Sequence, residues 1–156
     1  MRISALLGLA ALLAQPAQAL LCGTVLEPVR VTTAGLNFGS YFPGASSDLQ
    51  VSGTLKIDCG ALNADLLPDF TVQLSNGNTA TPSLRYMLKG TTRLNYNLYT
   101  GPGYGTVWST AAGQVVSFST VLNLGTINIP VYGAVFKGQF VATGTYTDSI
   151  TVMVNY

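Results

Sequence analysis

Apolar and polar residues alternate along most of this sequence, and no stretch repeats with the period of a helix. In the clearest segment, residues 49–59, Leu, Val, Gly, Leu, Ile and Cys alternate with Gln, Ser, Thr, Lys and Asp. A period of two sends successive side chains to opposite faces of a β-strand, so this segment predicts a strand with one buried and one solvated face. The chain is therefore predicted to be all-β.

Further alternating runs predict strands at residues 70–74, 84–88, 94–98, 116–118 and 127–135, with a weaker first strand at 25–31. Ser75–Asn78 predicts a turn, because Asn-Gly tolerates positive φ. Pro130 predicts that its strand lies at a sheet edge or contains a bulge, since proline cannot donate to the ladder. Seven or eight short, unequal strands favour a two-sheet antiparallel sandwich, with a closed barrel as the alternative.

The first 19 residues have the layout of a secretory signal peptide. Arg2 is followed by an apolar run at residues 3–13 and by Ala17-Gln18-Ala19, an A-x-A cleavage site. The alternative is a membrane anchor, but the run is shorter than the roughly 20 residues that span a bilayer. Residues 20–156 are therefore predicted to be one exported domain without a membrane span.

Composition argues against several classes of function. The chain has seven Lys and Arg against six Asp and Glu, and it has no histidine. Such a balance offers no basic patch for nucleic acid, and the lack of histidine removes His-based triads and His-ligated metals.

Asp58, Asp65 and Asp69 suggest a carboxylate pair or calcium site, but solvated or turn-capping roles fit them better. The Gly-rich run at 101–105 lacks the lysine of a phosphate loop and predicts a tight loop. No enzyme activity, catalytic residue, metal or cofactor is predicted.

Cys22 and Cys59 are the two cysteines of the chain. An even number in an exported chain predicts a disulfide, which would stabilise the fold by about 4 kcal/mol in the chain-entropy model. The alternative, a metal site with two cysteine ligands, lacks histidine partners.

The chain ends on a well-patterned strand, residues 146–156. Its inward face would carry Tyr146, Ile150, Val152, Val154 and Tyr156. No later segment in the sequence could pair with it. Its apolar edge is therefore either covered, as in many sandwiches, or filled by a strand from another molecule. The pattern alone leaves both possibilities open.

Several short motifs occur in a specific order through the exported part of the chain. They are Cys22, Leu36-Asn37-Phe38-Gly39 with Tyr41, Gly53-x-Leu55-x-Ile57-x-Cys59, Phe70-x-Val72-x-Leu74-Ser75-x-Gly77, Arg85-x-Met87, Leu94-x-Tyr96-x-Leu98-Tyr99 followed by Trp108, Val131-Tyr132-Gly133, and Gly144-x-Tyr146-x-Asp148-Ser149-Ile150-x-Val152-x-Val154-x-Tyr156. In this arrangement the chain resembles the spore coat U domain family, which includes subunits of archaic (Csu-type) chaperone–usher pili.

The resemblance implies an incomplete immunoglobulin-like antiparallel β-sandwich that lacks its last strand and is completed by a donor strand. It implies a periplasmic chaperone that lends this strand beside residues 146–156. At an outer-membrane usher, a neighbouring pilus subunit would then replace the chaperone's strand. Ile150, Val152 and Val154 would line the acceptor groove. The expected location is a cell-surface pilus or an extracellular coat, with roles in adhesion and biofilm formation.

One departure from the family concerns the residues before the first cysteine. Only Leu20 and Leu21 lie between the predicted cleavage site and Cys22, too few for a donor strand. The expectation is a subunit at the fibre tip. The alternatives are a non-polymerising coat protein or a different cleavage site.

A tip adhesin that binds a surface through apolar loops is the alternative function. Tyr41, Phe42 and Tyr104 are the candidate adhesive residues, together with residues 62–68. The competing interpretation is that these side chains fold back over the ends of the sandwich. Trp108 is assigned to the core from the resemblance, and Arg85 is expected to be structural.

Overall fold

The computed structural model describes residues 29–58, 69–81, 84–118 and 126–155. The predicted signal peptide, Cys22, Cys59, Asp65, the loop 62–68 and Tyr156 lie outside these residues. The strands of the described part are β1 (Arg30–Thr33), β2 (Leu49–Asp58), β3 (Phe70–Leu74), β4 (Tyr86–Lys89), β5 (Thr92–Tyr99), β6 (Val116–Phe118), β7 (Thr126–Val135) and β8 (Val152–Asn155).

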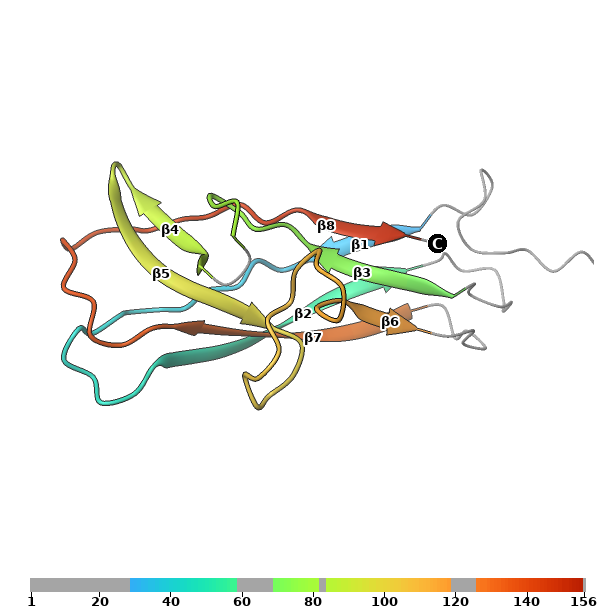
Figure 1. The fold of residues 1–156 in the computed structure, drawn as a ribbon, viewed down its shortest axis with the longest axis horizontal. Coiled ribbons are helices and arrows are strands. Elements are labelled where there is room, and N and C mark those ends of the chain that lie inside the picture. The colour runs from blue at the N-terminus through green and yellow to red at the C-terminus, as the bar shows by residue number, and fades with distance from the viewer. Residues whose placement is uncertain (1–28, 59–68, 82–83, 119–125, 156) are drawn as a thin grey trace, which may run out of the picture.

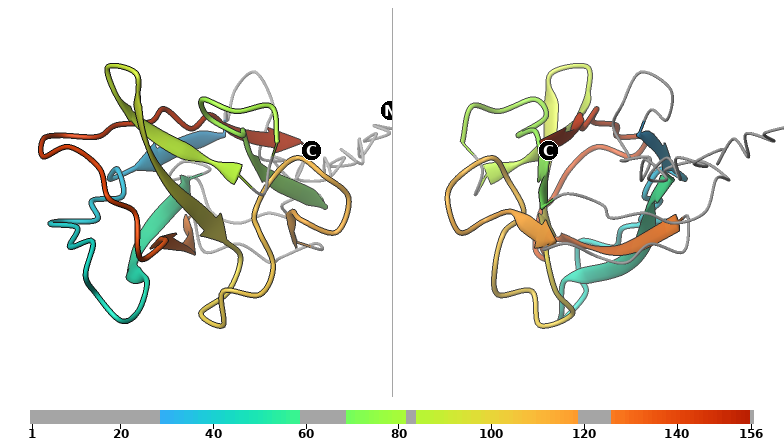
Figure 2. Two further views of the ribbon diagram at one scale, coloured as in Figure 1. Left: turned by 60° about the vertical axis from the view of Figure 1, so that its left-hand side comes forward. Right: turned by 90° about the vertical axis from the view of Figure 1, so that its right-hand side faces the viewer.

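These strands form two sheets whose strand pairs are all antiparallel (Figure 1). The larger sheet has the order β1-β2-β7-β5-β4, and the smaller sheet has the order β6-β3-β8. Both sheets curl, as the two turned views show (Figure 2). The predicted all-β fold and the predicted two-sheet sandwich are both present.

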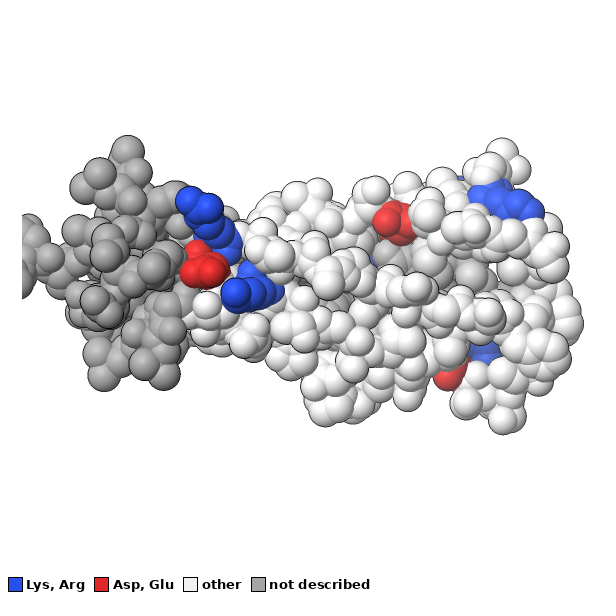
Figure 3. Space-filling model, turned by 180° about the vertical axis from the view of Figure 1, so that it is seen from behind, with Lys and Arg blue, Asp and Glu red and all other residues white. Residues whose placement is uncertain are grey.

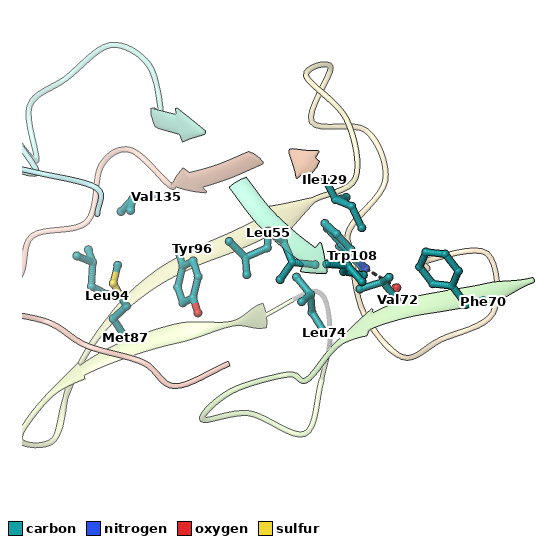
Figure 4. Packing of buried hydrophobic residues seen from close by; sticks show 12 residues of the cluster. Leu55, Phe70, Val72, Leu74, Met87, Leu94, Tyr96, Trp108, Ile129 and Val135 are labelled. Atoms are coloured by element: carbon teal, nitrogen blue, oxygen red, sulfur yellow. Dashed lines mark hydrogen bonds between the residues drawn. The ribbon is translucent and has the colours of Figure 1, made fainter. Parts of the chain in front are cut away.

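The longest ladder joins β2 and β7, which pair along all of their length from Leu49↔Val135 to Asp58↔Thr126. The alternation predicted for β2 is confirmed, because Leu55 and Ile57 are buried while Thr54 and Lys56 are exposed. Apolar side chains from both sheets meet between them (Figure 4). The buried hydrophobic cluster consists of Leu55, Ile57, Phe70, Val72, Leu74, Met87, Leu94, Tyr96, Leu98, Trp108, Ile129 and Val135.

The strand predicted at residues 84–88 is present as β4, but the face that it buries is not the predicted face with Leu84, Tyr86 and Leu88. The alternation of Leu84, Tyr86 and Leu88 predicts that these residues point inward, whereas Arg85 and Met87 are the buried side chains. Leu84 is 60 % exposed. The physical reason is that the guanidinium of Arg85 finds hydrogen-bond acceptors inside the fold, which makes its burial tolerable.

The prediction for Pro130 is wrong for its strand as a whole. β7 lies between β2 and β5, and its register with β2 runs through Thr54↔Pro130 without a bulge. The pairing with β5, however, covers only Tyr132 to Val135 of β7. Among the described strands, β7 therefore has one registered neighbour at Pro130, so the missing N–H can face away from β2 at little cost.

The terminal strand is shorter than the predicted residues 146–156, since β8 covers only Val152–Asn155. The segment before β8 changes neighbours. Thr147 pairs with Leu88 of β4 through two backbone hydrogen bonds of 2.8 and 3.1 Å, and Ser75 N–H donates to the Thr151 carbonyl over 2.9 Å at the end of β3. Because the segment passes from one sheet to the other, it cannot form one continuous ladder.

Candidate functional site

Two sheet edges border an open groove on one side of the sandwich. In the described part of the chain, β1 pairs only with β2, and β8 pairs only with β3. Between these edges lies a cavity of about 300 Å³. One wall is the segment from Thr33 to Phe38, which leaves β1, and the other is the segment from Tyr146 to Val152, which leads into β8.

The floor of the groove is part of the core. Residues from five strands form it, and most of them are aliphatic: Leu55 of β2, Leu74 of β3, Met87 of β4, Tyr96 and Leu98 of β5, and Val131 of β7. Figure 4 shows several of these side chains pointing into the space between the sheets. Most of the floor residues are themselves buried, with Leu55 and Leu74 each 2 % exposed, and the partly exposed apolar side chains of the groove lie on its walls, at Leu36, Phe38, Ile150 and Val152.

The structure brings together most of the residues predicted for this site. Tyr146, Ile150 and Val152 line the groove. Val154 packs against the core farther along β8 without lining the groove, and Tyr156 lies outside the described residues. The predicted alternation is visible in the burial up to residue 152, since residues 146, 148, 150 and 152 are partly buried whereas 147, 149 and 151 are exposed; within β8 it is lost, because residues 152, 153 and 154 are all partly buried. That these residues accept a strand stays a prediction.

Asp148 anchors this wall to the body of the protein, a role the sequence reasoning missed. Its carboxylate accepts hydrogen bonds from the Tyr96 hydroxyl over 2.7 Å, from Asn78 N–H over 3.1 Å and from Ser149 N–H over 2.8 Å. Burial, followed by the hydrogen bond to Asp148, raises the pKa of Tyr96 above its ordinary value. A carboxylate at an inward position of an otherwise apolar alternation was the signal that could have identified this anchor.

A second polar group closes the opposite side of the sandwich. The Arg85 guanidinium, fully buried, donates to the carbonyls of Ser75 and Trp108 over 2.7 and 2.6 Å and to Asn97 Oδ1 over 2.9 Å. Trp108 is fully buried, and its Nε1 donates to the Val72 carbonyl over 2.9 Å. Desolvation lowers the pKa of Arg85, against the opposing effects of Tyr96 and Asp148. These bonds join β5 and β3 through the loop that carries Trp108.

Two of the three candidate adhesive residues fold back onto the protein. Tyr41 packs against the core, and its hydroxyl accepts a hydrogen bond from Gln139 N–H over 2.8 Å. Tyr104 adopts a φ of 51° and makes edge-to-face contacts with Tyr99 and Tyr132, with ring centroids 5.3 and 6.1 Å away. This placement agrees with the competing interpretation for both residues.

The third candidate, Phe42, does project into solvent. Its side chain is 71 % exposed, and that of Phe140, which the sequence reasoning missed, is 88 % exposed. Phe42 follows Tyr41 and Phe140 follows Gln139, so the Tyr41–Gln139 hydrogen bond places both phenylalanines on neighbouring loops at one end of the sandwich. A phenylalanine two residues after Gly138, in the short run Lys137-Gly138-Gln139, was the available signal for Phe140.

Charged side chains are sparse on the face seen in Figure 3, where some basic and acidic groups lie beside one another and others stand alone. Lys56 and Asp58 form an ion pair, with 3.6 Å between the Lys56 Nζ and Asp58 Oδ2 atoms. Among the described residues, no three His, Cys, Asp or Glu side chains lie close enough to hold a metal ion. Within the same residues, no helix is long and apolar enough to cross a membrane.

Comparisons with known proteins agree on one family. The family model of the spore coat protein U domain matches residues 9–153. Protein U of Myxococcus xanthus is 31 % identical over 130 residues, which cover 78 % of this chain and 71 % of that protein.

A solved structure shows the same fold. It is the chaperone–tip adhesion subunit pre-assembly complex CsuC–CsuE from the archaic chaperone–usher Csu pili of Acinetobacter baumannii. The TM-score is 0.59 at 22 % identity, and the match covers 85 % of this chain but 40 % of that chain. The predicted immunoglobulin-like sandwich is confirmed by this likeness.

Proposed function

This chain belongs to the spore coat protein U domain family and is not an enzyme. On this basis we propose that it is a structural subunit of a chaperone–usher pilus or surface coat. Its groove accepts a β-strand from another polypeptide. Export by the predicted signal peptide, a Cys22–Cys59 disulfide and passage through the periplasm belong to this proposal. So do a periplasmic chaperone, an outer-membrane usher and neighbouring subunits as successive partners.

The observation that carries the proposal is the open groove beside β8. A strand edge with no registered partner presents N–H and C=O groups that a second strand can pair with. Beside it, the inward side chains of Ile150 and Val152 face a floor that includes Leu55 and Leu74. A donor with apolar residues at every second position would complete the ladder and fill the cavity at the same time. A compact small-molecule ligand would use the cavity but leave the edge of β8 unpaired.

Two single substitutions test strand capture. We expect Val152→Glu to abolish binding of the chaperone, or of a synthetic peptide with alternating valine and threonine, because it puts a charge into the apolar groove. Thr151→Glu is the matched control, since the neighbouring side chain is exposed and its backbone bonds remain possible. Pull-down from periplasmic extract and fluorescence polarisation of labelled peptide measure the two interactions. Equal capture by both variants would exclude this groove as the acceptor.

A second candidate function, surface adhesion, is favoured by the exposed pair Phe42 and Phe140. Neighbouring exposed aromatic side chains give a protein an apolar contact surface. We expect the double variant Phe42→Ala, Phe140→Ala to lose attachment to hydrophobic surfaces while fibre assembly continues. Unchanged attachment with intact fibres would remove these loops from consideration.

N-terminal sequencing of the exported protein tests the proposed tip position: ten or more residues before Cys22 would supply a donor strand and contradict it.

A further inference from the structure

The wall of the groove that leaves β1 is built from a short segment with alternating side chains. Leu36 and Phe38 are half-buried and pack against the core, whereas Asn37 between them is exposed. Glycines with positive φ flank the segment, at 22° for Gly35 and 71° for Gly39, and the Asn37 side chain accepts a hydrogen bond from Gly39 N–H over 2.8 Å. This geometry directs Leu36 and Phe38 into the space between the sheets.

Two glycines of the larger sheet form the seat for these side chains. Gly53 of β2 pairs with Val131, and Gly133 of β7 pairs with Val51, so the two glycines are diagonal neighbours on adjacent strands. A Cβ on Gly53 would lie 2.8 Å from Leu36. A Cβ on Gly133 would lie 2.5 Å from Leu36 and 2.8 Å from Phe38. Such distances are far below van der Waals contact, so Leu36 and Phe38 occupy space that glycine alone leaves open.

The ring of Phe38 is held from a second side as well. It packs edge-to-face against Tyr96, with centroids 5.6 Å apart, and the Tyr96 hydroxyl is fixed by its bond to Asp148. Figure 4 shows Tyr96 between Met87 and Leu55. The groove therefore has an aromatic part at Phe38 and Tyr96, and an aliphatic part lined by side chains such as Leu74 and Val152.

We propose that Leu36 and Phe38, seated on Gly53 and Gly133, form a fixed wall that selects the strand donor by size. This inference rests on the proposed function and names the sequence that the groove takes. The donor carries a small residue, such as glycine, alanine or serine, at the inward position that faces Phe38. At the inward positions that face Leu55, Leu74 and Val152 it carries large aliphatic residues. The two parts of the groove thereby fix the register of the incoming strand, because a slip by two residues brings a large side chain against the wall.

A peptide scan with the exported full-length protein tests this selection. The starting peptide alternates valine and threonine, with alanine in turn at each inward position, and a parallel set has phenylalanine there instead. We expect phenylalanine to weaken binding about tenfold or more at one inward position near one end of the peptide, as for overpacking of a fitted core. Phe38→Ala should remove the penalty at that position and at no other. Alanine in the peptide should be tolerated best at that same position, whereas alanine at the inward positions that face Leu55, Leu74 and Val152 should weaken binding several-fold, because it leaves apolar space unfilled.

The glycine seat is tested by adding a single methyl group. Gly133→Ala and Gly53→Ala should push the wall into the groove and weaken peptide binding about tenfold. Gly105→Ala is the matched control, because a Cβ there meets no atom within 4 Å and its φ is not positive. Leu36→Ala should restore binding in the Gly53→Ala protein, since Leu36 is what that Cβ would meet.

The outcomes separate the two proposals. If no alternating peptide binds the wild-type protein, strand acceptance itself fails. If alternating peptides bind but phenylalanine is tolerated equally at every inward position, strand acceptance stands and the size-selecting wall is wrong. If Gly105→Ala weakens binding as much as Gly133→Ala, the effect of the seat is not specific and the wall is again wrong.

Discussion

The two sides of the sandwich differ in how the space between the two sheets is filled. On the side of Trp108, the chain closes the space between the sheets itself, with one large side chain and a buried arginine whose donors reach carbonyls and Asn97. On the side between β1 and β8, a cavity of about 300 Å³ remains, and within the described residues these two edge strands do not pair with each other. A sandwich is stable where both apolar faces are covered, and under the proposed function a donor strand would supply this cover on the open side.

The largest effect is expected on the closed side. Trp108→Ala should destabilise the exported protein by about 3–5 kcal/mol, because it leaves a large cavity in a core position. Urea unfolding followed by circular dichroism measures the change, since Trp108 is the single tryptophan of the chain. Phe42→Ala is the control and should stay within about 0.5 kcal/mol. Similar losses for the two variants would show that the closed side is not the better-packed region.

Arg85→Met should cost about 2–4 kcal/mol. The substitution keeps the approximate length of the side chain but leaves the carbonyls of Ser75 and Trp108 without this donor in a buried place. Arg85→Lys should lie between wild type and methionine, because an ammonium group cannot reproduce the planar fork. A methionine variant as stable as wild type in urea would mean that relief of desolvation outweighs the lost bonds.

The anchor of the groove wall should respond to pH. Tyr96→Phe removes the bond to Asp148 and should cost about 1.5 kcal/mol at pH 7. The pKa of Tyr96 is raised in the folded protein, whereas an unfolded tyrosine titrates near 10. The unfolded state therefore loses a proton first, and stability due to Tyr96 declines as the pH rises above about 10. Urea midpoints at pH 7 and pH 11 should show the two proteins converging; a constant gap would contradict the raised pKa.

The smallest effect is expected on the open side. Ile150→Ala should destabilise the unpartnered protein by about 1 kcal/mol, since the side chain is only partly buried at the groove. The cost should grow when an alternating peptide is bound, because the donor completes the burial. Thermal unfolding with and without peptide measures both values. An equal cost in the two states would mean that the occupant of the groove does not contact Ile150.

The sequence predicted strand positions better than it predicted which face is buried. Nearly every alternating run became a strand in the structure, because a period of two is a local property of the chain. The prediction of the buried face was wrong at the start of β4, where Arg85 is buried and Leu84 is exposed. An arginine can be buried only if acceptors from other segments surround it, and those acceptors come from Ser75, Asn97 and Trp108. Residues so far from one another in the chain leave no periodic signal.

Half of the groove could also be found in the sequence. The alternation from Tyr146 to Val154 identified one wall and its inward side chains. The other wall consists of Leu36 and Phe38, which pack on Gly53 and Gly133, and these residues entered the sequence analysis only as parts of the family motifs. No local pattern shows that a glycine in one strand contacts a phenylalanine in a distant segment. Phe140 was missed for a similar reason: its exposure depends on the loop that Tyr41 holds in place.

By itself, the sequence determined that this protein is built from strands, where most of them lie, and that its last segment carries an apolar inward face. These properties follow from backbone geometry, which acts over a few residues. Only the tertiary structure decided that the last segment passes from β4 to β3, that Trp108 and Arg85 close one side, and that a groove stays open on the other. Sheet order and long-range packing decide which edges meet, and in this fold β1 and β8 border the groove without pairing with each other.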